Sequence, residues 1–117
     1  MNSAEFRILR RTLGLTHHDI ATAMNISERS ARRWEHTHQP PEDAARFLEE
    51  AYGNNMDRIA EQLDKHAHRV VPIPTYTNDG DTLTNWGLSL REYEAYAAQL
   101  IMVCRDRGVE YEVLPAE

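Results

Sequence analysis

The sequence has little cysteine and no long apolar run. Cys104 is its only cysteine, which excludes an internal disulfide and a zinc site built from cysteines. No stretch approaches the roughly 18 consecutive apolar residues of a membrane span. The first residues, MNSAEFRILRR, also lack the apolar core of a signal peptide. We therefore expect neither membrane insertion nor secretion, and a reducing cytoplasm is the expected location.

Positive charge is also scarce. The chain has 13 Lys and Arg against 19 Asp and Glu, a net charge of -6, which argues against a protein that coats nucleic acid by charge alone. Hydrophobic residues make up 41% and Gly and Pro only five each, which is typical of a folded chain. Residues 1–40 nevertheless hold six arginines against four acids, whereas residues 41–68 and 69–117 each carry a net -4. This local excess directs the search for function to the first third.

Motifs of catalysis and metal binding are absent from the sequence. It has no G-x-S-x-G, no P-loop and no coherent nucleophile–base pairing, and Cys104 lies in an apolar segment where a thiol is inert packing. Histidine pairs occur at 17–18, at 36 and 38, and at 66 and 68, without a further ligand nearby. The loop NDGD at 78–81 lacks the downstream spacing of an EF-hand. We expect a protein that is not an enzyme and that needs no cofactor or metal.

Helix start and stop signals follow one another through residues 1–68. Asn2 with Glu5, and Thr16 with Asp19, have the spacing of capping boxes, and Ser27 can cap a third helix. Residues able to adopt left-handed geometry, at 14 and 25, separate these helices. Two short helices joined by three or four residues make a helix-turn-helix, whose second member we place at 28–36. A fourth helix after Pro41 is expected to break at 53–55, and a fifth to run to about residue 68.

The pattern changes after residue 68. The segment RVVPIPTYT at 69–77 is β-branched but carries two prolines, which predicts an edge strand or an irregular extended segment. Residues 78–81 predict a turn, Ser89 with Glu92 starts a helix that stops at Gly108, and residues 109–113 alternate as a final strand. The expected fold is mainly α: a five-helix repressor-like helix-turn-helix domain at 1–68, then a small α+β strand-helix-strand tail at 69–117.

The helix of the tail is apolar on nearly every side. Residues 95–104, AYAAQLIMVC, contain only one strongly polar side chain, so this helix needs cover on nearly every side. A second copy of the chain is the expected cover, since two-fold dimers dominate small oligomers. The alternative is that the five-helix domain covers both faces. The side chains expected at the dimer interface are Tyr96, Leu100, Met102 and Val103.

The helix at 28–36 carries the strongest functional pattern. If Ala31 and Trp34 face inward, its arginines point outward, and such a helix fits the major groove of B-DNA. Arginine matches the O6/N7 pair of guanine, glutamate can accept from cytosine N4, and residues at helix starts suit phosphate oxygens. The alternative is a solvated arginine face on an ordinary helical bundle. The candidate DNA-binding residues are Thr16, His17, Ser27, Glu28, Arg29, Ser30, Arg32 and Arg33.

The stretch LRRTLGLTHHDIATAMNISERSARRWE resembles the phage-repressor and Cro-like helix-turn-helix family, often called the XRE family. The likeness rests on Leu13-Gly14-Leu15-Thr16, on Ala21, on Ile26-Ser27 and on Arg33-Trp34-Glu35, and covers residues 3–65. It implies sequence-specific binding of double-stranded DNA, as a homodimer on a palindromic operator. His17 stands where the family has glutamine, and Thr37 where many members have glycine.

The resemblance also implies roles by position. His17 and Ser30 are expected to approach phosphate, Glu28, Arg29 and Arg33 to read bases, and Arg10 to form a buried ion pair with Glu35. The overall layout with Asn85-Trp86 resembles, more weakly, the small Aca-type (anti-CRISPR-associated) autorepressors of phages and mobile elements. It implies repression of the protein's own operon. Two alternatives stay open: an antitoxin or adaptor whose tail binds a partner protein, and an autorepressor that also binds RNA.

Overall fold

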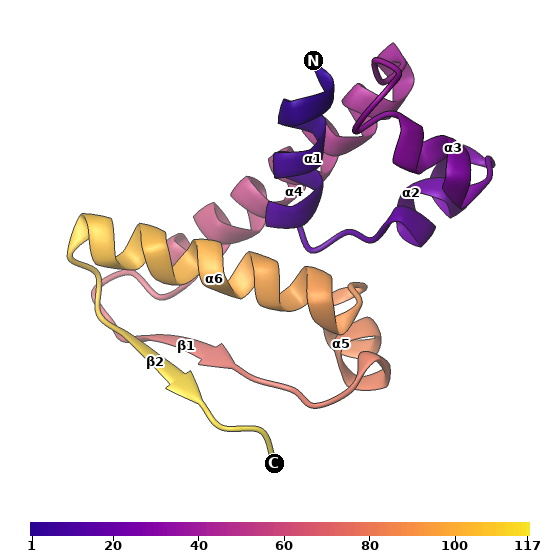
Figure 1. The fold of residues 1–117 in the computed structure, drawn as a ribbon. Coiled ribbons are helices and arrows are strands. Elements are labelled where there is room, and N and C mark those ends of the chain that lie inside the picture. Colours follow the sequence, from indigo (N-terminus) through magenta and orange to yellow (C-terminus); the bar gives the residue numbers. More distant parts are fainter. The chain divides into compact units, whose positions relative to one another are not determined.

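A computed structural model describes residues Met1–Glu117, and the chain is mainly helical with one small parallel sheet. It divides into two compact units, the N-terminal unit Met1–Gly53 and the C-terminal unit Asn54–Glu117 (Figure 1). None of the helices combines the length and the apolar character needed to cross a bilayer. The elements in chain order are α1 (Ser3–Thr12), α2 (His17–Met24), α3 (Glu28–Arg33), α4 (Glu42–Lys65), β1 (Val71–Pro74), α5 (Asp79–Trp86), α6 (Leu90–Arg107) and β2 (Tyr111–Leu114).

The N-terminal unit packs α1, α2, α3 and the first part of α4 around one apolar cluster. Phe6, Ile20, Ala31 and Leu48, one from each helix, are all fully buried in it. The Trp34 ring lies edge-on to Phe6, with the ring centroids 6.1 Å apart. This core therefore fixes the short helix α3 against the other three helices by its Ala31 side.

The C-terminal unit places α6 over a two-stranded sheet. β1 and β2 pair in parallel, with Val71 opposite Tyr111 and Ile73 opposite Val113, which requires the crossover that α5 and α6 provide (Figure 1). Val71 and Ile73 are buried with Tyr93, Tyr96 and other residues of α6. The remaining members of this cluster are Ile59 of α4, Leu88, Ala97, Leu100 and Cys104.

The prolines of β1 lie where a strand tolerates them. The backbone amide of Val71 donates to the carbonyl of Glu110, the residue before β2. The amide of Thr75 donates to the carbonyl of Leu114, the last residue of β2. The backbone amides of successive residues point to opposite edges of a strand. The nitrogens of Pro72 and Pro74 therefore lie at the free edge of β1, where no amide donor is needed. The predicted edge strand is confirmed.

The predicted break at 53–55 is wrong. α4 is continuous from Glu42 to Lys65, because Asn55 is buried and its side-chain amide donates to Gln99 of α6 at 3.4 Å and accepts from Arg58 at 3.0 Å. A single interior glycine such as Gly53 costs a helix only about 1 kcal/mol. The compact units accordingly divide within α4, earlier than the boundary at residue 68 that the sequence predicts.

Two further boundaries differ from the prediction. Residues 78–81 begin a helix instead of forming a turn, because the side chain of Asn78 accepts from the amide of Asp81 and caps α5. The same residue types serve turns and N-caps, so the local sequence does not distinguish them. Helix α3 ends at Arg33, short of the predicted residue 36, and turns continue to Thr37.

Candidate functional site

Helices α2 and α3 are held together by local caps. Thr16 and Asp19 form a reciprocal capping box at the start of α2, and Asn25 ends it in the left-handed region at a φ of 55°. Ser27 accepts from the amide of Ser30 at 3.1 Å, and its hydroxyl donates to that of Ser30 at 3.0 Å. The hydroxyls of Thr16 and Ser27, which the sequence predicts to approach phosphate, therefore act as helix caps. The hydroxyl of Ser30, for which the resemblance implies the same role, accepts from that of Ser27.

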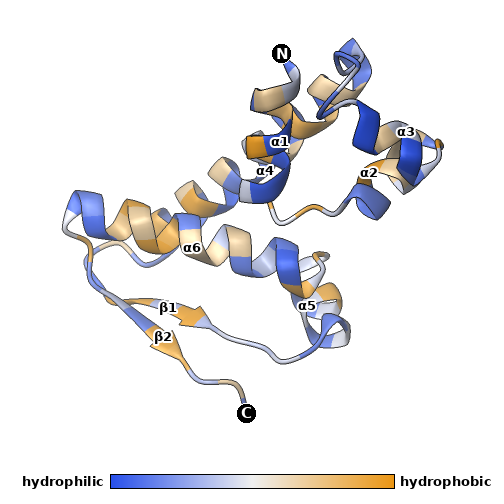
Figure 2. Ribbon diagram, viewed as in Figure 1, coloured by the Kyte–Doolittle hydropathy of each residue, from blue (hydrophilic) through white to orange (hydrophobic).

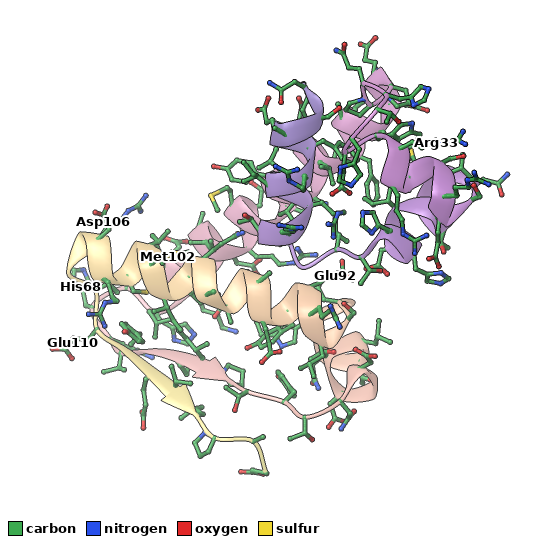
Figure 3. The ribbon with its side chains drawn as sticks, viewed as in Figure 1. Arg33, His68, Glu92, Met102, Asp106 and Glu110 are labelled. Carbon is green, nitrogen blue, oxygen red and sulfur yellow. The ribbon has the colours of Figure 1, made fainter.

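One side of α3 is strongly polar and exposed. Arg29, Arg32 and Arg33 are all exposed, whereas Ala31 is fully buried. Figure 2 shows α3 as largely hydrophilic, and Figure 3 shows the Arg33 side chain pointing away from the helix into open space. At about 100° per residue, Arg29 lies roughly opposite the midpoint between Ala31 and Trp34. Arg29 thus marks the centre of the outward face, with Arg32 and Arg33 on either side.

Glu28 lies on the flank of α3 next to α2. Its Oε1 is 3.0 Å from Nδ1 of His18 on α2, and its Oε2 accepts from Nη2 of Arg32 at 3.0 Å. The side chains are 42% exposed for Glu28 and 56% for Arg32, so water screens this pair. Both oxygens of a predicted base-reading carboxylate are therefore engaged within the chain. Arg29 and Arg33, by contrast, form no ion pair or side-chain hydrogen bond.

Arg10 and Glu35 form a two-pronged ion pair in the interior of the N-terminal unit. Arg10 donates from Nε to Oε2 at 2.7 Å and from Nη2 to Oε1 at 3.1 Å, and its Nη1 donates to the Leu15 carbonyl at 2.8 Å. The Glu35 side chain is only 1% exposed. This is the pair that the resemblance implies. It ties α1 to the segment that follows α3.

His17 joins this pair instead of facing outward. Its Nε2 lies 2.6 Å from Oε2 of Glu35, in a contact that is close but not aligned as a hydrogen bond. Burial alone would raise the pKa of Glu35, but Arg10 and His17 together hold it below its ordinary value of 4.5. The resemblance implies that His17 approaches phosphate. In the structure its ring is instead half-buried against the Glu35 carboxylate.

The residues predicted for a dimer interface separate into two groups. Tyr96 and Leu100 are 1% and 2% exposed inside the apolar cluster of the C-terminal unit, so both are covered within one chain and neither is free to contact a second copy. Tyr96 lies against the rings of Tyr93 and Trp86, and Ile59 of α4 belongs to the same cluster. Met102 is 58% exposed and Val103 half-buried, and both remain surface positions.

The aromatic cluster of the C-terminal unit contains perturbed hydroxyls. Burial raises the pKa of Tyr96 to about 12, and its hydroxyl has no hydrogen-bond partner within the protein. Burial also raises the pKa of Tyr93, whose hydroxyl donates to the Pro74 carbonyl, and that of the Cys104 thiol. These groups stay protonated at neutral pH. No group of three or more His, Cys, Asp or Glu side chains is arranged to hold a metal ion.

Sequence reasoning missed His18. Its contact with Glu28 joins residues ten apart on two different helices, and no local pattern marks such a pair. The same holds for His17 and Glu35. No protein-family model matches the chain, and no curated protein is significantly similar to it.

Proposed function

We propose that this chain is a sequence-specific DNA-binding transcriptional repressor that acts as a homodimer on a palindromic operator. The observation that carries the proposal is α3, which presents three exposed guanidiniums on one face while its opposite face is fixed in the core. An α-helix of this kind fits the major groove, and the arginine fork matches the acceptor pair of guanine. Bound at a promoter, the protein would exclude polymerase, which requires no cofactor.

The arrangement of α2 and α3 supports a repressor-like helix-turn-helix. Ala21 is buried, Gly14 has a φ of 72°, and Ser27 caps the second helix, so the residues that carry the resemblance to the XRE family have matching structural roles. The weaker resemblance to Aca-type autorepressors favours the protein's own operon as the target. The buried pair of Arg10 and Glu35 would keep α3 rigid during binding.

Dimerisation is part of the proposal because one short helix offers few contacts. Two copies of α3 held about 34 Å apart would enter successive major grooves on one side of the duplex. With Tyr96 and Leu100 in the core, the C-terminal unit offers Met102 and other exposed apolar side chains for the contact. These are Val70, Leu83 and Val113.

Binding-site selection from a pool of random-sequence duplexes, with the full-length protein, tests this function. We expect enrichment of a palindromic motif, and sedimentation should show two protomers per duplex. Arg33→Ala should weaken binding to the enriched duplex by about 1–3 kcal/mol and relax one position of each half-site. Arg46→Ala is the matched control, since Arg46 is exposed on α4 and paired with Glu42. Equal retention of all duplexes at moderate salt would contradict the proposal.

A further inference from the structure

We propose that Glu28 is a positioning residue that restrains Arg32, and that α3 reads bases through Arg29 and Arg33 alone. This inference rests on the proposed function. It also specifies the DNA that α3 would bind, a duplex whose half-sites contain guanines. It also departs from the role that the resemblance implies for Glu28, which is base reading.

Glu28 lies at the edge of the outward face of α3. At about 100° per residue, Glu28 lies roughly a quarter-turn away from Arg29, the residue at the centre of the outward face. It is on the side that meets α2, as its contact with His18 shows. A side chain on that flank is displaced from the line along which α3 would approach the base edges.

Both oxygens of the Glu28 carboxylate already have partners within the chain. A carboxylate that reads cytosine must accept from N4, yet Oε1 of Glu28 faces His18 and Oε2 accepts from Arg32. The hydrogen bond also removes one donor of the Arg32 guanidinium and offsets its charge. Glu28 and Arg32 therefore satisfy each other, which leaves two guanidiniums on α3 with no acidic partner.

The spacing of Arg29 and Arg33 along α3 is similar to that of about two steps of stacked base pairs. Arg29 and Arg33 are four residues apart, so they lie on the same side of α3 and about 6 Å apart along its axis. Base pairs are stacked about 3.4 Å apart. Two arginine forks at this separation match two guanines within about two base-pair steps, on either strand. The expected half-site is thus rich in guanine at adjacent or next-but-one positions.

Glu28→Gln is the decisive variant, because it keeps the shape of the side chain and removes its charge. Selected on the same pool of random duplexes, full-length Glu28→Gln should enrich the same motif as wild type. Since the carboxylate charge that offsets Arg32 is removed, the dependence of log Kd on log salt should steepen by about 1 per protomer. Arg29→Gln is the contrasting variant, and it should lose the preference for guanine at one position of each half-site.

The outcomes separate the two proposals. If wild type enriches no motif, the proposed function fails, and the assignment of base readers fails with it. Suppose instead that wild type enriches a motif with a cytosine preference, and that this preference is fivefold or more weaker in the motif of Glu28→Gln. In that case the proposed function stands and the positioning role of Glu28 is overturned. Side-chain NMR of arginine Nε–H groups tests the restraint without DNA: the Arg32 signal should shift in Glu28→Gln, and an unchanged signal would also overturn that role.

Discussion

Replacing Glu35 by alanine would leave the Arg10 guanidinium stranded inside the N-terminal unit. The two side chains are only 10% and 1% exposed, and after the change Arg10 keeps a single hydrogen bond, to the Leu15 carbonyl. Removal of one partner from a buried ion pair costs about 3–5 kcal/mol. We expect the free energy of unfolding of this unit to fall by that amount, a large fraction of the roughly 5–15 kcal/mol of a typical domain.

Truncation of the other partner, Arg10, should lower the free energy of unfolding by less. Arg10→Met leaves the Glu35 carboxylate without its main partner, but His17 Nε2 remains 2.6 Å away. We expect a loss of about 1.5–3 kcal/mol, the range of hydrogen bonds to charged groups. The order of the two losses therefore reports whether His17 supports Glu35.

Urea unfolding followed by tryptophan fluorescence measures both losses. Trp34 packs on Phe6 in the N-terminal unit, whereas Trp86 packs on Tyr93 in the C-terminal unit. A Trp86→Phe background therefore confines the signal to the unit under test. If Glu35→Ala lowered the free energy of unfolding by less than about 1 kcal/mol, the reasoning would be refuted, because an ion pair exposed to solvent contributes no more than that. A larger loss for Arg10→Met than for Glu35→Ala would contradict the supporting role of His17.

The same urea unfolding, repeated at acid pH, tests the charge of Glu35. Its pKa is lowered on folding, so the unfolded chain binds the proton more tightly than the native state. The stabilisation is complete above the ordinary value of 4.5 and is lost as pH falls below it through the folded pKa. Glu35→Gln should lack this loss. Acid curves of the same shape for wild type and Glu35→Gln would mean that the carboxylate is not the titrating group.

Three further substitutions test single positions. Gly53→Ala should raise the free energy of unfolding by about 0.5–1 kcal/mol, because Gly53 lies within α4 and an added Cβ meets nothing within 4 Å. Gly87→Ala, at a φ of 70°, should lower it by a similar amount or more, and thermal melts giving both changes the same sign would contradict this expectation. Met102→Asp should shift the proposed dimer toward monomer in sedimentation, with Glu94→Asp, also exposed on α6, as control. An intact dimer would remove Met102 from the interface.

Local chemistry made the helix ends predictable. The capping boxes at Thr16 and Ser89 and the left-handed caps at Asn25 and Gly108 all lie where the sequence predicts them. Each involves residues no more than four apart, so the pattern of residue types contains the whole interaction. The fold class, mainly helical with a small sheet, follows from the same signals.

The errors have long-range causes. Gly53-Asn54-Asn55 reads as a helix break because nothing nearby shows that Asn55 is paired with Gln99, 44 residues away. Tyr96 packs in one cluster with Ile59 of α4, and its ring centroid is 5.4 Å from that of Trp86, whereas the sequence alone predicts a second copy as its cover. Both errors therefore arise from tertiary contacts. In the candidate site, the engagement of Glu28 by His18 is equally tertiary, and no local pattern predicts it.

The distribution of cations constrains how the proposed repressor could bind. In the N-terminal unit Arg10, Arg32 and Arg46 are paired with acids, whereas the arginines without an ion pair are Arg7, Arg11, Arg29 and Arg33. With two of these assigned to bases, two remain for phosphates, and each phosphate contact contributes only about 0.9 to the salt dependence. The net charge of -6 opposes non-specific binding further. Affinity would therefore depend on two half-sites occupied together, since the second contact of a dimer is made at high effective concentration. This dependence would make the protein more selective for its operator. A duplex with only one matching half-site would bind it weakly, because few free cations are left to contact phosphates.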